Sequence, residues 1–249
     1  MALISVEDDV EIRSTIAHHL LRSFKSVLVF LPNPNAAQEN LCSDVKIIRY
    51  DALTNGAVPR AINAVINAAH NIWMNYCFNS EYLFYPLCER RSVGELLEFN
   101  TSEDRNAMMI FVIDLYAADL TTTPNAVSLT DAMIDATGYY APARTTPDNH
   151  NFLLECQLDF YGGLRWRFEQ YVPKRSVESA VWRCFYVNAG CNCRQMRRSM
   201  IPAYKYLYRR IAQQPQRDHP VFSRRKSAAG KYAKQVCPHG LSMACLCTI

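Results

Sequence analysis

Strands are predicted where short runs of apolar, often β-branched residues are closed by polar or turn-forming residues. Four such runs stand out, at residues 26–31, 45–50, 72–78 and 108–115. The first run is closed by Pro32-Asn33-Pro34-Asn35, which ends a strand and begins a loop. These runs predict strands that are buried within a sheet.

Between these runs, apolar residues recur at the three- and four-residue intervals of a helix. A first helix is predicted over residues 8–24, because the acids at 7–9 suit the positive end of a helix dipole. A second begins near Pro59, and a short third helix follows Ser92, with Glu95 completing a capping box. The alternation predicts an α/β fold, a mostly parallel sheet with helices on both faces.

Polar side chains follow the predicted strands at the edge where such sheets bind ligands. Asp51 follows the second run, Asn79-Ser80-Glu81 the third, and Asp114 lies near the end of the fourth. Acidic and amide oxygens at one edge are typical ligands of a divalent cation that faces phosphates. Capping of helices or turns is an equally good interpretation of Asp51 and Asp114. Glu81, between apolar neighbours, needs a partner or a metal.

Two arginines follow the pair Gly162-Gly163 in an apolar segment. Arg165 and Arg167 are two residues apart, so on an extended chain they point to the same side and would grip a diphosphate or an acidic acceptor. Pairing with structural carboxylates is the competing interpretation. For His18-His19 we expect a structural role.

The composition, with 49% hydrophobic residues, 12 Pro and 8 Gly, excludes collagen-like, low-complexity and wholly disordered classes. We expect no transmembrane segment, because no apolar stretch approaches the roughly 18–20 residues that a bilayer requires. Acids at residues 7–11 stand where a signal peptide would have basic and apolar regions. We therefore expect a cytoplasmic protein.

Charge divides the chain into two parts that the net charge of +4 conceals. Residues 1–173 hold 12 Lys and Arg against 21 Asp and Glu, a net charge of −9. Residues 174–249 hold 15 Lys and Arg against Glu178 and Asp218, a net charge of +13, together with six of the ten cysteines. We therefore expect an α/β domain over 1–173 and a basic, cysteine-rich, poorly structured tail over 174–249.

Several blocks of the first part occur in the order seen in one family. The segments are Ser5-Val6-Glu7-Asp8, His18-His19, Val27-Leu28-Val29-Phe30, Phe78–Leu83 and Leu158–Phe168. In this order, residues 1–173 resemble the bacterial glycosyltransferase family 2-like proteins, which are related to the family 92 type and have the GT-A fold. The resemblance stops near residue 173.

The resemblance implies a nucleotide-sugar donor, bound near Glu7, Asp8 and Asp51, and an acceptor that the sequence does not identify. It also implies a divalent metal, Mn or Mg, which neutralises the leaving nucleoside diphosphate. The metal motif falls on Asn79 and Glu81, where the family usually has two aspartates. Losing one carboxylate weakens the binding of a hard cation, so the chain is either a sugar transferase or an inactive remnant of one.

The tail permits three interpretations. Cys-x-Cys and Cys-x-His pairs suggest a zinc site, although strong zinc modules use Cys-x2-Cys spacing. Arginine pairs with interleaved tyrosines suggest nucleic-acid binding, and we favour both of these interpretations less than the third. The leading hypothesis is a reading-frame shift near residues 173–177, because the tail has many arginines and cysteines and almost no acids. The shift would remove the acceptor side of a GT-A pocket.

Two function classes therefore remain open. The leading one is sugar transfer from a nucleotide-sugar donor, with Asn79 and Glu81 at the metal and Arg165 and Arg167 at the diphosphate or acceptor. The alternative is a non-catalytic binding or interaction protein whose basic tail contacts an acidic partner.

Overall fold

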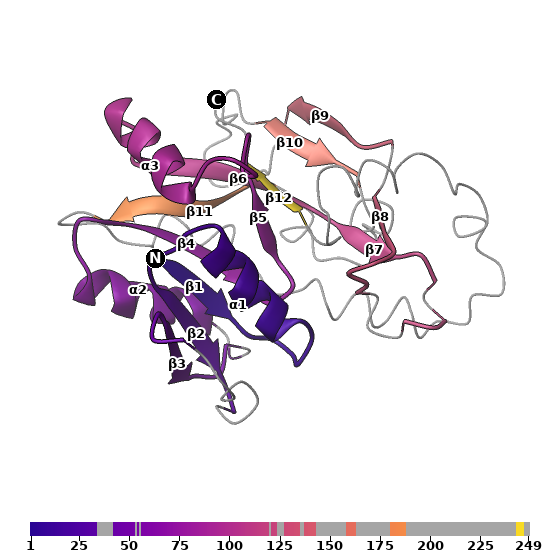
Figure 1. Cartoon of the computed structure of the whole chain (residues 1–249), viewed down its shortest axis with the longest axis horizontal. Helices are drawn as coiled ribbons and strands as arrows, with labels where there is room; N and C mark the ends of the chain where they lie inside the picture. The colour runs from indigo at the N-terminus through magenta and orange to yellow at the C-terminus, as the bar shows by residue number, and fades with distance from the viewer. Residues whose placement is uncertain are drawn as a thin grey trace, which may run out of the picture.

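A mixed, mostly parallel sheet forms the centre of an α/β architecture (Figure 1). The computed structural model describes residues 1–33, 42–52, 54, 56–119, 121–123, 127–134, 137–142, 158–162, 180–187 and 243–246. In these residues the sheet has eight strands. Their spatial order is β3 (Val45–Arg49), β2 (Val27–Leu31), β1 (Ala2–Ser5), β4 (Ile72–Phe78), β11 (Ala180–Val187), β6 (Ala107–Ile113), β12 (Met243–Leu246) and β5 (Tyr82–Phe84).

The direction of the strands changes once the sheet passes β4. Strands β3, β2, β1 and β4 are parallel neighbours. β11 is antiparallel to both β4 and β6, so β6 runs in the same direction as β4. β12 is antiparallel to β6 and parallel to β5. Five strands thus end at one edge of the sheet, which is the edge that carries the polar residues of the predicted site.

Helices cover both faces of this sheet, as the alternating pattern predicts. They are α1 (Ile12–Leu21), α2 (Ala57–Ala68) and α3 (Val93–Ser102). Ile16 of α1 and Val93 of α3 belong to one buried cluster with Val29. Ile62 of α2 belongs to a second buried cluster, which includes Leu3. Because side chains of β1 alternate between the two clusters, the sheet is buried on both faces, which confirms the predicted α/β class.

The boundaries of two helices show how local hydrogen bonds select the helix start. α3 begins where predicted, because the Ser92 side chain accepts from Glu95 N at 3.3 Å and Ser92 N donates to the Glu95 carboxylate at 2.7 Å. α1 begins at Ile12, four residues later than predicted. Asp8 accepts from Val10 N at 2.9 Å, and Glu11 has a left-handed φ of 54° that no α-helix contains.

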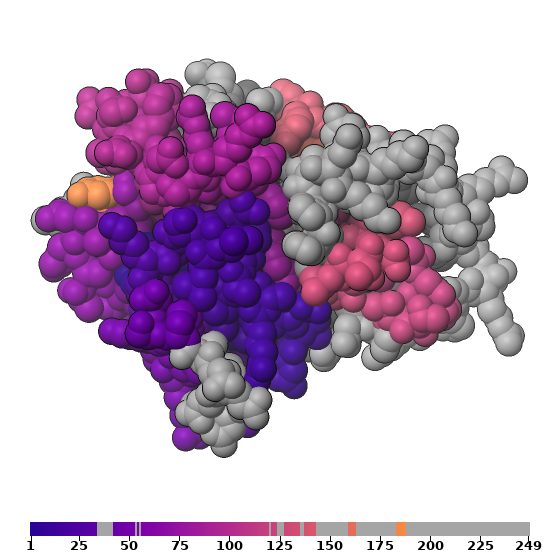
Figure 2. Space-filling model, viewed as in Figure 1, coloured from indigo at the N-terminus to yellow at the C-terminus, as the bar shows by residue number. Residues whose placement is uncertain are grey.

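Two small antiparallel sheets accompany the main one in the described residues. β7 (Leu115–Ala117) pairs with β8 (Ala132–Ile134), and β9 (Tyr139–Pro142) pairs with β10 (Leu158–Tyr161). In Figure 2 the N-terminal segment, in indigo, forms the middle of the visible face, next to magenta atoms that follow it in the sequence.

Strand β11 belongs to the part of the chain for which we expected an irregular tail. It lies between β4 and β6, and Cys184, Phe185 and Val187 are at most 2% exposed. β12 comes from the same part and also joins the sheet. The other residues of 174–249 lie outside the described ones, and the domain boundary at residue 173 stays a prediction. Residues 180–187, however, are a central strand.

Replacing Phe185 with alanine tests whether β11 is part of the core. Phe185→Ala should lower the free energy of unfolding by about 3–5 kcal/mol, because it removes a fully buried aromatic ring and leaves a cavity. Urea denaturation of the full chain measures this change. Phe99→Ala is the control, since Phe99 is 53% exposed and its loss should change stability by less than about 0.5 kcal/mol. Equal effects of the two substitutions would show that β11 does not pack as described.

Candidate functional site

The order of the strands reverses between β1 and β4. From β1 the chain proceeds to β2 and then β3 on one side, and it returns to place β4 on the other side of β1. Open α/β sheets bind ligands at such a reversal, beyond the carboxyl ends of the strands. Here β1 leads into an acidic loop over residues 6–11, and β4 leads into a turn over residues 79–81. These two segments form the candidate site.

Asn79 joins the two segments through its side-chain amide. Its Oδ1 accepts a hydrogen bond from Glu7 N at 2.9 Å. Its Nδ2 donates to Asp8 O at 3.0 Å, to Asp8 Oδ1 at 2.8 Å and to Val10 O at 2.8 Å. Asn79 is 0% exposed. The amide therefore fixes the path of the acidic loop relative to the end of β4.

Ser80 ties the same turn to helix α1. It has a φ of 65°, in the left-handed region that residues other than glycine rarely adopt. Ser80 N donates to Thr15 Oγ1 at 2.8 Å, and Ser80 Oγ donates to Val10 O at 3.1 Å. Such a conformation costs about 1–3 kcal/mol and persists when its surroundings determine it. These hydrogen bonds hold the turn in place.

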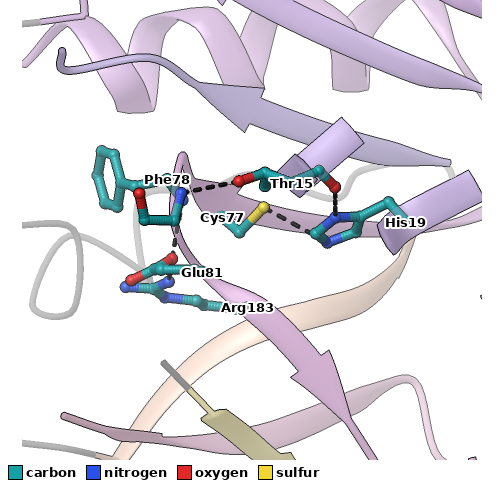
Figure 3. Close-up of polar contacts among 7 residues, drawn as sticks. Thr15, His19, Cys77, Phe78, Glu81 and Arg183 are labelled. Atoms are coloured by element: carbon teal, nitrogen blue, oxygen red, sulfur yellow. Dashed lines mark hydrogen bonds and ion pairs between the residues drawn. The ribbon is translucent and has the colours of Figure 1, made fainter. Parts of the chain in front are cut away.

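Glu81 ends the turn inside the protein (Figure 3). Its Oε2 accepts from Phe78 N at 2.8 Å and forms an ion pair with Nη1 of Arg183, which belongs to β11. The guanidinium carbon of Arg183 also lies 5.4 Å from the ring centroid of Tyr76 and 5.5 Å from that of Phe78. The side chains are 3% exposed for Arg183 and 11% for Glu81. The carboxylate thus has the partner that its apolar sequence setting requires.

These contacts do not fit Asn79 and Glu81 as ligands of a divalent cation. The Asn79 amide is used to hold the acidic loop, and a cation beside Glu81 would lie next to the Arg183 guanidinium. The described residues contain no cluster of three or more His, Cys, Asp or Glu side chains that would hold a metal ion. A divalent metal elsewhere in the site stays a prediction.

Two histidines of α1 pack behind the turn. His19 Nδ1 donates to Thr15 O at 2.8 Å, so Nε2 is left to accept from the Cys77 thiol, whose Sγ lies at 3.5 Å. His19 is fully buried, and this burial lowers its pKa, which keeps the imidazole neutral. Figure 3 shows the ring pointing from α1 toward Cys77 of β4. His18 Nε2 donates to Leu83 O at 2.8 Å, so the contacts of both histidines agree with the expected structural role of the pair.

The other predicted site residues fall into two groups. Glu7 and Asp8 lie in the acidic loop, and Asp51 is exposed directly beyond β3 at the same edge. Because β2 separates β3 from β1, Asp51 lies about 10 Å from the acidic loop along the edge. Arg165 and Arg167 lie outside the described residues.

Arg183 is the residue that sequence analysis missed. In the sequence Arg183 is one of many basic residues of the tail. No pattern in the sequence connects residue 183 with residue 81. One signal was present: Arg183 stands in the apolar run Ala-Val-Trp-Arg-Cys-Phe-Tyr-Val. A lone arginine in a buried strand requires an anion, just as Glu81 requires a cation.

Removing the hydrogen bonds that the Asn79 amide donates to the acidic loop should destabilise the fold. In Asn79→Asp a carboxylate replaces the donating amide and faces the Asp8 carboxylate and two carbonyl oxygens. We expect a loss of at least about 1–3 kcal/mol at neutral pH, measured by urea denaturation, and a smaller loss at low pH, where the new carboxyl is protonated. Asn71→Asp, in a turn at the amino end of β4, is the control. An Asn79→Asp variant as stable as this control would show that the Asn79 amide does not hold the acidic loop.

His18 should make the protein sensitive to acid. Burial, together with the positive charge that His19 and Arg22 would place nearby, lowers the pKa of His18 from 6.5 to about 3. The unfolded chain takes up this proton below about pH 6.5 and the folded chain does not, so the contribution to stability is full above pH 6.5 and falls with pH toward 3. In urea denaturation, His18→Gln, which keeps a donor for Leu83 O, should lose less stability than the parent between pH 7 and 5. Parallel losses would contradict this assignment.

Comparisons with protein-family models, with curated proteins and with solved structures found no match to this chain. No helix in the described part of the chain is long and apolar enough to cross a membrane.

Proposed function

We propose that the protein binds a nucleotide-sugar donor at the carboxyl edge of its sheet and acts in sugar transfer, as the bacterial glycosyltransferase family 2-like proteins with the GT-A fold do. One observation carries the proposal. The strand order reverses between β1 and β4, and the acidic loop is fixed at that reversal by Asn79. Nucleotides bind at this position in other open α/β sheets.

One part of the edge suits the nucleoside end of a nucleoside diphosphate, whereas the acidic loop would hold the diphosphate end only through a cation that offsets its carboxylates. Asp51 is exposed beyond β3, and a carboxylate there accepts hydrogen bonds from ribose hydroxyls or from a base. The acidic loop with Glu7 and Asp8 lies two strands away, about 10 Å along the edge. An extended nucleoside diphosphate spans such a distance, so the donor lies across the ends of β3, β2 and β1.

Sugar transfer also requires stabilisation of the leaving group. The acceptor hydroxyl oxygen forms a bond to the anomeric carbon and releases its proton to the solvent, while the bond from that carbon to the diphosphate oxygen breaks and negative charge collects on the nucleoside diphosphate. The metal that the resemblance implies would neutralise this charge. Asn79 and Glu81 do not fit that metal, so the proposal assigns them no step. Arg165 and Arg167 stay the predicted contacts of the diphosphate or the acceptor.

A second function has support from the same contacts. Because Asn79 and Glu81 are engaged inside the protein, the chain would hold a nucleotide sugar without transferring the sugar. This is the non-catalytic class that the sequence left open, and the basic part of the chain would then contact an acidic partner. Donor binding is common to both functions, and turnover separates them.

Titration of the purified full chain with uridine or guanosine diphosphate tests donor binding. We expect binding, and we expect Asp51→Asn to weaken it about tenfold, because the variant loses a charged hydrogen-bond acceptor. Asp44→Asn is the matched control: Asp44 is equally an exposed carboxylate, but it precedes β3 and lies at the opposite edge. Absence of nucleotide binding, or equal binding by both variants, would contradict the proposed site.

Release of nucleoside diphosphate from a bound nucleotide sugar separates the two functions. The transferase predicts release that increases with time and with added acceptor sugars. The binding protein predicts saturable binding with no release above the rate without protein.

A further inference from the structure

We propose that Arg183 is an internal cation that holds the turn after β4, and through it the acidic loop, in place. The inference deepens the proposed function and rests on it, since it concerns the shape of the same donor site. It makes Arg183 a positioning residue, because its guanidinium acts through Glu81 and does not touch the donor.

Arg183 is linked to the end of β4 through Glu81. Arg183 forms an ion pair with Glu81 Oε2, and the same oxygen accepts from Phe78 N at 2.8 Å. Phe78 is the last residue of β4, so the carboxylate connects β11 to the point where β4 ends. Figure 3 shows the Arg183 side chain reaching from β11 to Glu81 beside this point.

The turn that Glu81 closes is linked in turn to the acidic loop. Asn79 and Ser80 lie between Phe78 and Glu81, and both ends of this short turn are fixed by the Glu81 carboxylate. Inside the turn, Asn79 holds Glu7 N and Asp8, and Ser80 holds Val10 O. If Glu81 moved out toward solvent, the turn would move with it, and the acidic loop would lose its hydrogen bonds to Asn79 and Ser80.

The charge of Glu81 is balanced inside the protein. An ionised carboxylate that is about nine-tenths buried is stable only beside a positive charge, which a metal or a basic side chain supplies. The guanidinium supplies it here, and the rings of Tyr76 and Phe78 stabilise the guanidinium in turn. A divalent cation at Glu81 would be repelled by this charge. The site should therefore keep its shape when divalent cations are removed.

The experiment compares the full chain with two variants at Arg183, with one control variant at Arg90, and with Glu81→Gln. Arg183→Met removes the charge, Arg183→Lys keeps it, and Arg90→Met is the control because Arg90 is exposed in the segment after β5. Each is titrated with uridine and guanosine diphosphate in Mn²⁺ and in EDTA, and with Mn²⁺ alone. Amide hydrogen exchange is followed at Phe78, Glu7 and Ile66, whose amides report on the turn, the loop and α2.

We expect the parent, Arg90→Met and Arg183→Lys to bind nucleotide in Mn²⁺ and to show the same exchange at Phe78 and Glu7 in Mn²⁺ and in EDTA. In Arg183→Met we expect exchange at Phe78 and Glu7 to be at least about tenfold faster, with Ile66 unchanged, together with weaker nucleotide binding and new Mn²⁺ binding at the exposed carboxylate. Local loss of protection distinguishes positioning from general destabilisation, which would accelerate all three amides.

Three results would overturn the inference. They are faster exchange at all three amides in Arg183→Met, exchange at Phe78 and Glu7 that does not change, and Mn²⁺ binding by the parent that is lost in Glu81→Gln. Failure of the proposed function gives a different result, because then the parent binds no nucleotide in either condition while the exchange at Phe78 and Glu7 still responds to Arg183→Met.

Discussion

A buried carboxylate needs a positive partner, and the ion pair of Glu81 with Arg183 meets this need beside the end of β4. The pair connects the turn after β4 to β11, which lies between β4 and β6. Without it, one charge would remain in an apolar core, and the turn would not be held at both ends. The position of the acidic loop, and of any ligand there, depends on this pair.

Hydrogen bonds between backbone and side chains hold the segments at this edge of the sheet in place. Asn79 binds the loop, Ser80 binds α1 and the loop, and Glu81 binds the end of β4. The Glu81 carboxylate points inward to Arg183 and to the end of β4, so it does not face a cation at the edge.

Local signals in the sequence were reliable where the structure is also local. The capping box of Ser92 and Glu95 gave the start of α3, and the run at 72–78 gave the whole of β4. The start of α1 was wrong by four residues, because Asp8 and Glu11 form a turn whose shape is held by Asn79, which lies far away in the sequence. Such a contact leaves no mark on helical periodicity.

The sequence by itself determined the α/β class, the order of most strands and helices along the chain, and the presence of polar residues at one edge. It also showed that Glu81 needs a partner, because burial of a charge is costly whatever the fold. Only the tertiary structure decided that the partner is Arg183 and that Asn79 serves the loop. The physical reason is that β11 joins the sheet through antiparallel pairing with β4 and β6, and such pairing between distant segments is set by the whole core.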